Sequence, residues 1–150
     1  MLFRSGSLGL SPTARREERL LDAPTFHAAS ARRAGPIAVD VVSHDATTLE
    51  GVVDMVGALG HRVERTSIGR PRFDGTAGVL LWDCRVLSRD DIEWLRLLVA
   101  NRRDLAVVIL DSFPRGDVAA AALSAGATAV LGRPVNLETL AGTIDRAAAP

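Results

Sequence analysis

The sequence predicts an α/β domain in which a doubly wound, five-stranded parallel sheet is covered by helices on both faces. Short segments rich in Val, Ile and Leu alternate along the chain with longer segments whose apolar residues recur every three or four positions. One short segment, residues 104–111 ("DLAVVILD"), is a continuous apolar run, which is typical of a parallel strand buried on both sides. Right-handed crossovers between such strands favour a three-layer sandwich.

The first predicted strand covers residues 36–42 ("PIAVDVV"), a short and β-branched segment. Residues 45–60 follow with one apolar helical face, and Asp45 or Thr47 is suited to cap the start of this helix. Residues 61–66 ("HRVERT") alternate between polar and apolar positions, which predicts the second strand.

Residues 67–77 ("SIGRPRFDGTA") contain three turn-forming residues and no helical face, so we expect a loop. The third strand is predicted at residues 78–83 ("GVLLWD"). A helix follows at residues 88–103, where Ser88 and Asp91 have the spacing of a capping box.

The fourth strand is the apolar run described above, and a short Ala-rich helix at residues 115–127 follows it and is closed by Gly126. The fifth strand is predicted at residues 128–132 ("TAVLG"). The last helix, residues 136–149, is capped by Asn136. Its predicted inward face consists of Leu137, Leu140 and Ile144.

Two domain-level segments are expected. Residues 1–34 mix Ser, Gly, Pro and Arg without sustained periodicity, which predicts a flexible N-terminal tail or linker. A short docking helix capped by Thr13 is the alternative for this part. Residues 35–150 form the predicted folded domain.

Composition narrows the possible partners and the compartment. The formal net charge is zero, and all 18 basic residues are arginine, so no basic footprint for nucleic acid is indicated. No apolar stretch approaches the roughly 20 residues that span a bilayer. The single cysteine, Cys84, excludes an internal disulfide and suits a reducing compartment, so we expect the cytoplasm.

Polar residues follow four of the five predicted strands. Because the carboxyl ends of parallel strands meet at one edge of a sheet, these side chains are expected to converge around Asp83. Asp45 has the alternative role of a helix cap, and Asp111 has the alternatives of facing water or pairing with Arg133. The positions concerned are Ser43, His44, Asp45, Asp83, Asp111 and Arg133.

From about Ile37 to Ala148 the chain resembles a response-regulator receiver domain of the CheY-like type. The matching segments are "AVDVVSHD", "ALGHRV", "GVLLWDCR", "VVILDSF" and "LSAGATAVLGRPVNLETL". The resemblance implies the flavodoxin-like, five-stranded fold. It also implies a phosphorelay role in which a histidine kinase donates a phosphoryl group to an aspartate, and Asp83 matches that acceptor.

The metal site of this family is altered. Family members carry an acidic pair after the first strand that holds Mg²⁺, whereas this chain has Ser43 and His44 there. Asp45 and Asp83 remain as candidate metal ligands. Because Mg²⁺ prefers hard oxygen ligands, its binding is expected to be weakened, and no other cofactor is expected.

The phosphate-handling positions depart as well. The hydroxyl residue after the fourth strand is Asp111, whose charge repels a phosphoryl group, and the family Lys is Arg133. The aromatic switch position is Val130, and the second helix is expected to be shortened to the loop around residues 69–75. These departures predict a degenerate receiver, or pseudo-receiver.

The predicted function is therefore that of a protein-interaction module in bacterial two-component signalling that acts without normal phosphorylation. The expected partner is a histidine kinase, an output protein or a second copy, bound through the fourth helix, fifth strand and fifth helix.

One alternative is an atypical receiver phosphorylated on Asp83. A second is a flavodoxin-like domain that binds a small molecule of the cobalamin type, suggested by His44, although Val42 and Thr47 depart from that pattern. No enzyme activity is expected, and Cys84 is interpreted as a core residue.

Overall fold

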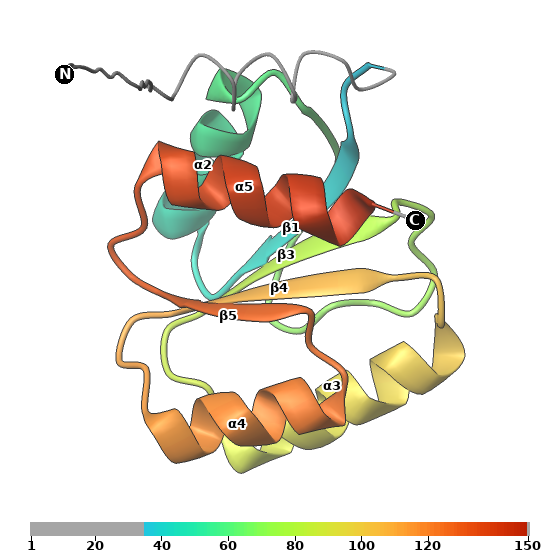
Figure 1. The fold of residues 1–150 in the computed structure, drawn as a ribbon, viewed down its shortest axis with the longest axis vertical. Helices are drawn as coiled ribbons and strands as arrows, with labels where there is room; N and C mark the ends of the chain where they lie inside the picture. Colours follow the sequence, from blue (N-terminus) through green and yellow to red (C-terminus); the bar gives the residue numbers. More distant parts are fainter. Residues whose placement is uncertain (1–34, 150) are drawn as a thin grey trace, which may run out of the picture. The chain divides into compact units, whose positions relative to one another are not determined.

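The computed structural model describes residues 35–149, and its fold is the predicted one (Figure 1). Residues 1–34, with the predicted tail and its alternative cap Thr13, lie outside the described residues. The elements are β1 (Ala38–Ser43), α2 (Ala46–Ala58), β2 (Arg62–Ile68), β3 (Val79–Cys84), α3 (Arg89–Asn101), β4 (Ala106–Asp111), α4 (Gly116–Ala125), β5 (Ala129–Gly132) and α5 (Leu137–Ala148).

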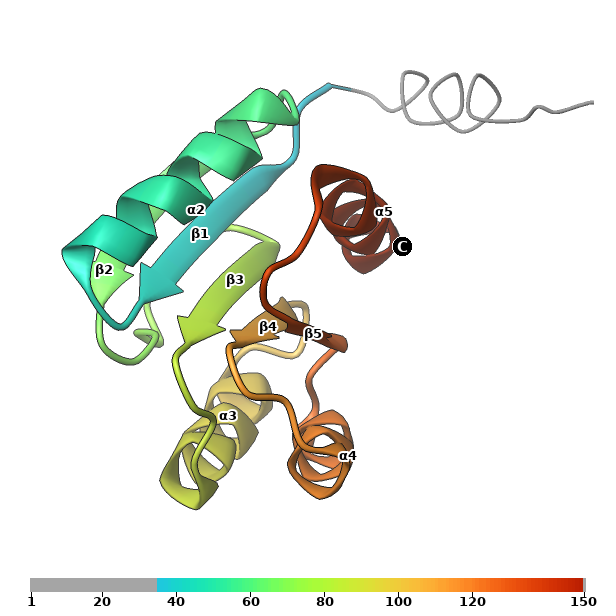
Figure 2. The same ribbon diagram turned by 90° about the vertical axis from the view of Figure 1, so that its left-hand side faces the viewer.

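All five strands form one parallel sheet in the order β2-β1-β3-β4-β5. Helices α2 and α5 cover one face, and α3 and α4 cover the other (Figure 2). Because β1 and β3 are neighbours while the chain winds outward from them in both directions, the strand order reverses at this pair. The carboxyl ends of β1 and β3 are thus the place where a doubly wound sheet presents a site.

The core is divided by the sheet into two apolar clusters, as the alternation of side chains along a strand requires. On one face, Leu81 and Leu110 pack with Leu140 and Ile144 of α5. On the other face, Trp82 and Ile109 belong to the cluster that includes α3 and α4. Every residue of β3 is buried, so its last two residues, Asp83 and Cys84, are held inside the protein and not at a solvated strand end.

The predicted helix caps are present. The Asp45 side chain accepts a hydrogen bond from the Thr48 backbone N–H at 2.7 Å, and Asn136 does the same for Thr139 at 2.7 Å. Ser88 and Asp91 form the reciprocal capping box of α3. Gly126 ends α4 with a positive φ of 120°, a conformation that glycine adopts without steric cost.

One predicted core position is wrong. Leu137 does not face inward but is 45% exposed, whereas Leu140 and Ile144 are fully buried. Leu137 is the first residue of α5, and the buried residues of this helix begin one turn later. The helical period alone does not show where along the helix the underlying sheet begins.

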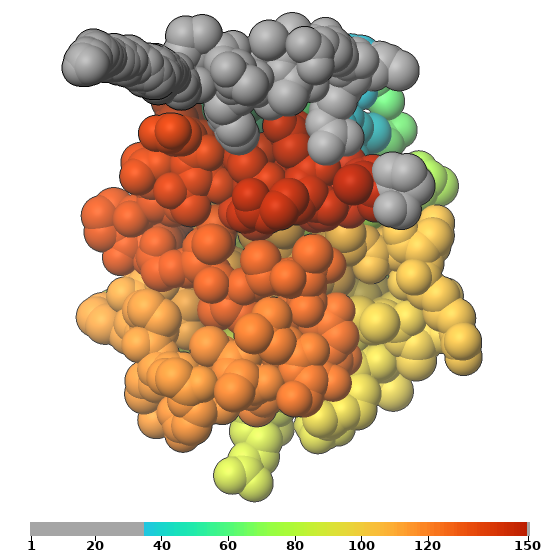
Figure 3. Space-filling model, in the orientation of Figure 1, coloured from blue at the N-terminus to red at the C-terminus, as the bar shows by residue number. Residues whose placement is uncertain are grey.

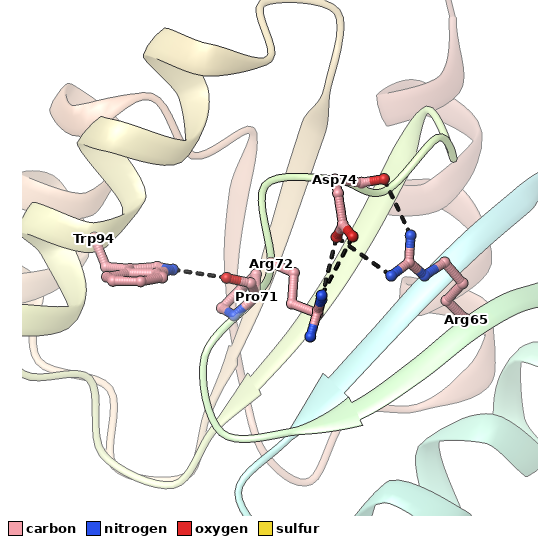
Figure 4. Close-up of polar contacts among 5 residues, drawn as sticks. All are labelled: Arg65, Pro71, Arg72, Asp74 and Trp94. Atoms are coloured by element: carbon pink, nitrogen blue, oxygen red, sulfur yellow. Dashed lines mark hydrogen bonds and ion pairs between the residues drawn. The ribbon is translucent and has the colours of Figure 1, made fainter.

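The second helix, which was expected to be shortened, is absent from the described residues. The chain between β2 and β3 forms bends and turns, consistent with Gly69 at a φ of 103° and with Pro71. This loop lies against α3, where the Trp94 indole N–H donates to the Pro71 carbonyl at 2.8 Å (Figure 4). The Phe73 ring also stacks on Trp94, with centroids 5.1 Å apart.

Two arginines tie the loop to neighbouring elements, one to the sheet and one to the end of α3. Arg65 of β2 donates to the Asp74 carbonyl at 3.0 Å (Figure 4), and Arg102 donates to the Ala77 carbonyl at 2.7 Å. Beneath the loop lies a cavity of about 40 Å³ whose lining includes Asp40 and Gly75. Burial raises the pKa of Asp40, against the opposing effect of Arg65 and Arg102. The loop thus covers the part of the sheet that the missing helix leaves open.

Candidate functional site

The centre of the site is Asp83, which is 0% exposed at the carboxyl end of β3. The parallel register places Ser43 of β1 directly beside it. The Ser43 hydroxyl is also fully buried and donates a hydrogen bond to Asp83 Oδ2 at 2.8 Å. One of the two carboxylate oxygens is therefore occupied by a neutral donor from the adjacent strand.

The other oxygen of Asp83 faces a cation. Arg133 follows β5 and is anchored by its backbone N–H, which donates to the Asp111 carbonyl at 3.0 Å. Its Nη1 lies 3.0 Å from Asp83 Oδ1, and the arginine side chain is 28% exposed. Neither of these two atoms has an aligned hydrogen bond with any described residue, so their contact is an ion pair held by charge. Such a partner offsets part of the cost of removing a carboxylate from water.

His44 and Asp45 lie at the rim of the site. His44 Nδ1 is 3.8 Å from Asp83 Oδ2, and His44 Nε2 is 2.9 Å from Asp45 Oδ2. Asp45 itself is half exposed and caps α2, and the hydrogen bond from the Thr48 N–H lowers the pKa of its carboxyl. Asp45 is thus engaged at the start of the helix and is linked to Asp83 only through the imidazole of His44.

Asp111 does not join this group through its carboxylate. The alternation along β4 places it on the face of Ile109, whereas Asp83 shares a face with Leu81. Its Oδ1 accepts a hydrogen bond from the Phe113 backbone N–H at 2.9 Å. The suggested ion pair between Asp111 and Arg133 is therefore wrong, because the guanidinium of Arg133 pairs with Asp83 instead.

Two arginines that the sequence interpretation did not identify line the mouth of the site. Arg70 and Arg85 border a pocket of about 270 Å³ together with His44, Asp83 and Asp91. Arg70 also pairs with Asp91 at 3.0 Å. Arg70 comes from the loop that replaces the second helix, and no motif in the sequence indicates that this loop reaches the site.

Cys84 adjoins Asp83 but is a core residue, as predicted. It is buried in the apolar cluster that contains Trp82 and Ile109. Burial raises the pKa of its thiol, and the nearby carboxylates of Asp91, Asp111 and Asp83 act in the same direction. Such a thiol is a poor nucleophile because the reactive thiolate is disfavoured.

The arrangement does not fit Mg²⁺. This ion prefers several oxygen ligands in octahedral geometry, and guanidinium groups repel it. Here Asp83 is already paired with Arg133, and two further arginines line the pocket mouth. Among residues 35–149, no three His, Cys, Asp or Glu side chains are grouped so that they could hold a metal ion.

Within the same range no helix is long and apolar enough to cross a bilayer.

Comparison with known proteins relates the chain by structure rather than by sequence. No protein-family model matches the sequence, and no curated protein does. A crystal structure from Burkholderia pseudomallei, described as a pilus assembly-related protein, matches with a TM-score of 0.69 and 28% identity. The match covers 75% of this chain and 89% of that one. A pilus assembly protein (CpaE) from Burkholderia thailandensis matches with the same score and identity, over 76% of this chain and 99% of that one.

Response-regulator structures also match. A CheY-like receiver domain protein from Methanospirillum hungatei has a TM-score of 0.61 and 18% identity, over 75% of this chain and 93% of that one. At this identity the likeness shows the fold alone. In this chain Asp83, Ser43 and Arg133 lie at the carboxyl edge of the sheet of that fold.

Proposed function

We propose that this domain, which has the CheY-like fold of response-regulator receiver domains, is a protein-interaction module that is not switched by phosphorylation. One observation carries the proposal. Asp83 is completely buried, with Ser43 hydrogen-bonded to one oxygen and Arg133 paired with the other. The side chain that a kinase would have to phosphorylate is already neutralised within the protein.

Phosphoryl transfer needs conditions that this site does not supply. The attacking carboxylate oxygen has to reach the phosphorus atom, and the charge that develops on the phosphoryl oxygens has to be stabilised. Asp83 is not exposed, and the hydroxyl donor of the family is replaced by Asp111. In this proposal the Arg133–Asp83 pair fixes the strand ends permanently in one arrangement.

We further propose that the partner surface is formed by α4, β5 and α5. Residues of these three elements, coloured from orange to red, form one continuous face of the molecule (Figure 3). β5 is an edge strand, and Leu123 of α4 is 48% exposed. The partner would be a protein of a bacterial signalling system inside the cell, and the two Burkholderia structures favour one connected with pilus assembly.

No catalytic turnover is proposed. The buried thiol of Cys84 has a raised pKa, which argues against covalent catalysis at the residue next to Asp83. His44 is engaged with Asp45 through Nε2, which argues against the metal-ligand role that a cobalamin-type site would require.

The test is incubation of the full chain with acetyl phosphate and Mg²⁺, followed by intact mass measurement. A receiver domain that accepts acetyl phosphate serves as the positive control, and the Asp83→Asn variant serves as the negative control. We expect no phosphorylated species. Stoichiometric, hydroxylamine-labile labelling that disappears in the Asp83→Asn variant would refute the proposal and support the atypical phosphoacceptor instead.

A further inference from the structure

A second concave surface lies on the opposite side of the sheet from α2 and α5. Helices α3 and α4 run side by side there (Figure 2), and a groove of about 510 Å³ lies along their amino-terminal halves. Its apolar lining is Leu87, Ile92, Val118 and Ala121. The small side chain of Ala121 is exposed, which leaves room for another element to approach α4 closely.

Charged side chains border this groove unevenly. Arg96 and Glu93 neutralise each other through an ion pair of 2.6 Å. Arg89 and Arg115 are exposed and make no ion pair with any residue in the range 35–149, and Asp117 is the one remaining carboxylate of the lining. The groove therefore carries two uncompensated guanidinium groups against one carboxylate, on an apolar base.

Large exposed apolar side chains lie in the loops that lead into α3 and α4. Val86 immediately precedes Leu87 and is 52% exposed, and Phe113 lies two residues before Arg115 and is 63% exposed. Their two loops are joined by a hydrogen bond from the Ser112 N–H to the Arg85 carbonyl at 3.2 Å. Val86 and Phe113 are thus exposed apolar side chains in two linked loops, each close in sequence to a residue that lines the groove.

We propose that the α3–α4 groove binds an acidic, amphipathic helix of a partner protein. A groove between two helices accepts a third helix through apolar residues spaced three and four apart. Glutamate or aspartate side chains flanking those residues would pair with Arg89 and Arg115, and Phe113 would cover one end of the bound helix. This groove is separate from the Asp83 site, and it shares helix α4 with the α4–β5–α5 face through Asp117, Val118 and Ala121. The inference does not depend on whether Asp83 is phosphorylated.

Other classes of occupant suit the groove less well. An anionic membrane or a nucleic acid presents dense negative charge, whereas the lining offers two arginines without an ion pair to a described residue, with Asp117 beside them. A flat bilayer surface would also not enter a concave groove. The groove border carries both arginines and a carboxylate. It suits a helix whose own carboxylates lie only where they face Arg89 and Arg115.

The probe is a synthetic peptide of about 15 residues with leucines at helical spacing and flanking glutamates, matched by a second peptide with lysines in place of the glutamates. Binding to the full chain is measured by fluorescence anisotropy. We expect the glutamate peptide to bind and the lysine peptide not to bind. The Arg89→Glu/Arg115→Glu double variant should weaken glutamate-peptide binding by about ten-fold or more and should gain affinity for the lysine peptide.

The matched control is Arg103→Glu, which makes the same charge change at an exposed arginine outside the groove. It should leave binding within about two-fold, and Phe113→Ser should weaken it several-fold. Circular dichroism verifies folding, which is expected because Arg89 and Arg115 are exposed and make no ion pair with a described residue.

Three results would overturn the inference. The first is no binding of the glutamate peptide, or equal binding of both peptides. The second concerns anionic phospholipid vesicles. If the double variant lost vesicle binding but kept peptide binding, the two arginines would serve a membrane and not a helix. The third is a concentration-dependent dimer that the double variant abolishes, since the groove would then be occupied by a second copy.

Discussion

Arg133 places a guanidinium nitrogen 3.0 Å from an oxygen of Asp83, although Asp83 belongs to β3 and Arg133 follows β5, and these strands are not neighbours in the sheet. The pair closes the carboxyl edge of the sheet across β4. Because Asp83 has no contact with water, this cation and the Ser43 hydroxyl are its main compensation for lost hydration. Removing either one tests whether the site is held together as described.

Arg133→Ala is expected to destabilise the protein strongly, because it leaves a buried carboxylate without its cation. The free energy of unfolding should fall by about 3 kcal/mol, the lower end of the range for such pairs since Arg133 is partly exposed. Chemical denaturation measures this value. Arg103→Ala, at an exposed arginine, should change it by less than about 0.5 kcal/mol. An equal effect of the two variants would contradict the ion pair.

Ser43→Ala should lower the free energy of unfolding by about 1–3 kcal/mol, because Asp83 Oδ2 then loses its hydrogen-bond donor while it remains buried. The matched control is Ser124→Ala, at an exposed position of α4. Denaturation curves of both variants provide the comparison. If Ser43→Ala were as stable as the control, water would have to replace the hydroxyl, and the site would be more open than proposed.

Gly75→Ala tests the loop that replaces the second helix. A Cβ atom at this position would lie 2.5 Å from Asp40 Oδ2 and 3.3 Å from Arg102 Nη1, so either the Asp40 side chain or the loop would have to shift. We expect a loss of about 1–3 kcal/mol in the free energy of unfolding. Gly78→Ala in the same loop has no atom within 4 Å and should be neutral or slightly stabilising. The reverse order of the two variants would show that the loop packs differently.

Asp40→Asn should alter the dependence of stability on pH. Burial raises the pKa of Asp40 in the folded protein, so its ionisation is less favourable there than in the unfolded chain. This unfavourable contribution is absent below the unfolded pKa, grows as the pH rises through the folded pKa, and is complete at neutral pH.

The asparagine variant should therefore gain stability relative to the native protein between about pH 3 and pH 7. Arg65 and Arg102 lower the pKa of Asp40 and Glu64 raises it, but burial is the largest effect and sets the direction. Denaturant midpoints at the two pH values measure the difference. If the difference in stability between the Asp40→Asn variant and the native protein stayed constant with pH, Asp40 would ionise as freely in the folded protein as in the unfolded one.

Much of the fold followed from local patterns. The apolar run of β4, the capping box of Ser88 and Asp91, and the left-handed Gly126 each act within a few residues of the chain, and each lies in the structure as predicted. Leu137 was assigned wrongly because its burial depends on where the sheet lies beneath α5, which is not a local property.

The candidate site was predictable in part. The rule that parallel strands end at one edge correctly placed Ser43, His44 and Arg133 near Asp83. The same rule did not predict that Arg133 pairs with Asp83, and it did not predict that Arg70 lines the pocket beside Asp83. Both depend on the direction of long side chains and on the path of a loop without periodic structure.

The sequence by itself determined the alternating strands and helices, their caps and the edge of the sheet at which Asp83 would lie, because these features depend on periodicity and on neighbouring residues. Only the tertiary structure decided that Arg133 pairs with Asp83 and not with Asp111, and that a loop of arginines covers the place of a missing helix. The physical reason is that charge pairing and burial depend on distances across the sheet, which residues far apart in the chain set together.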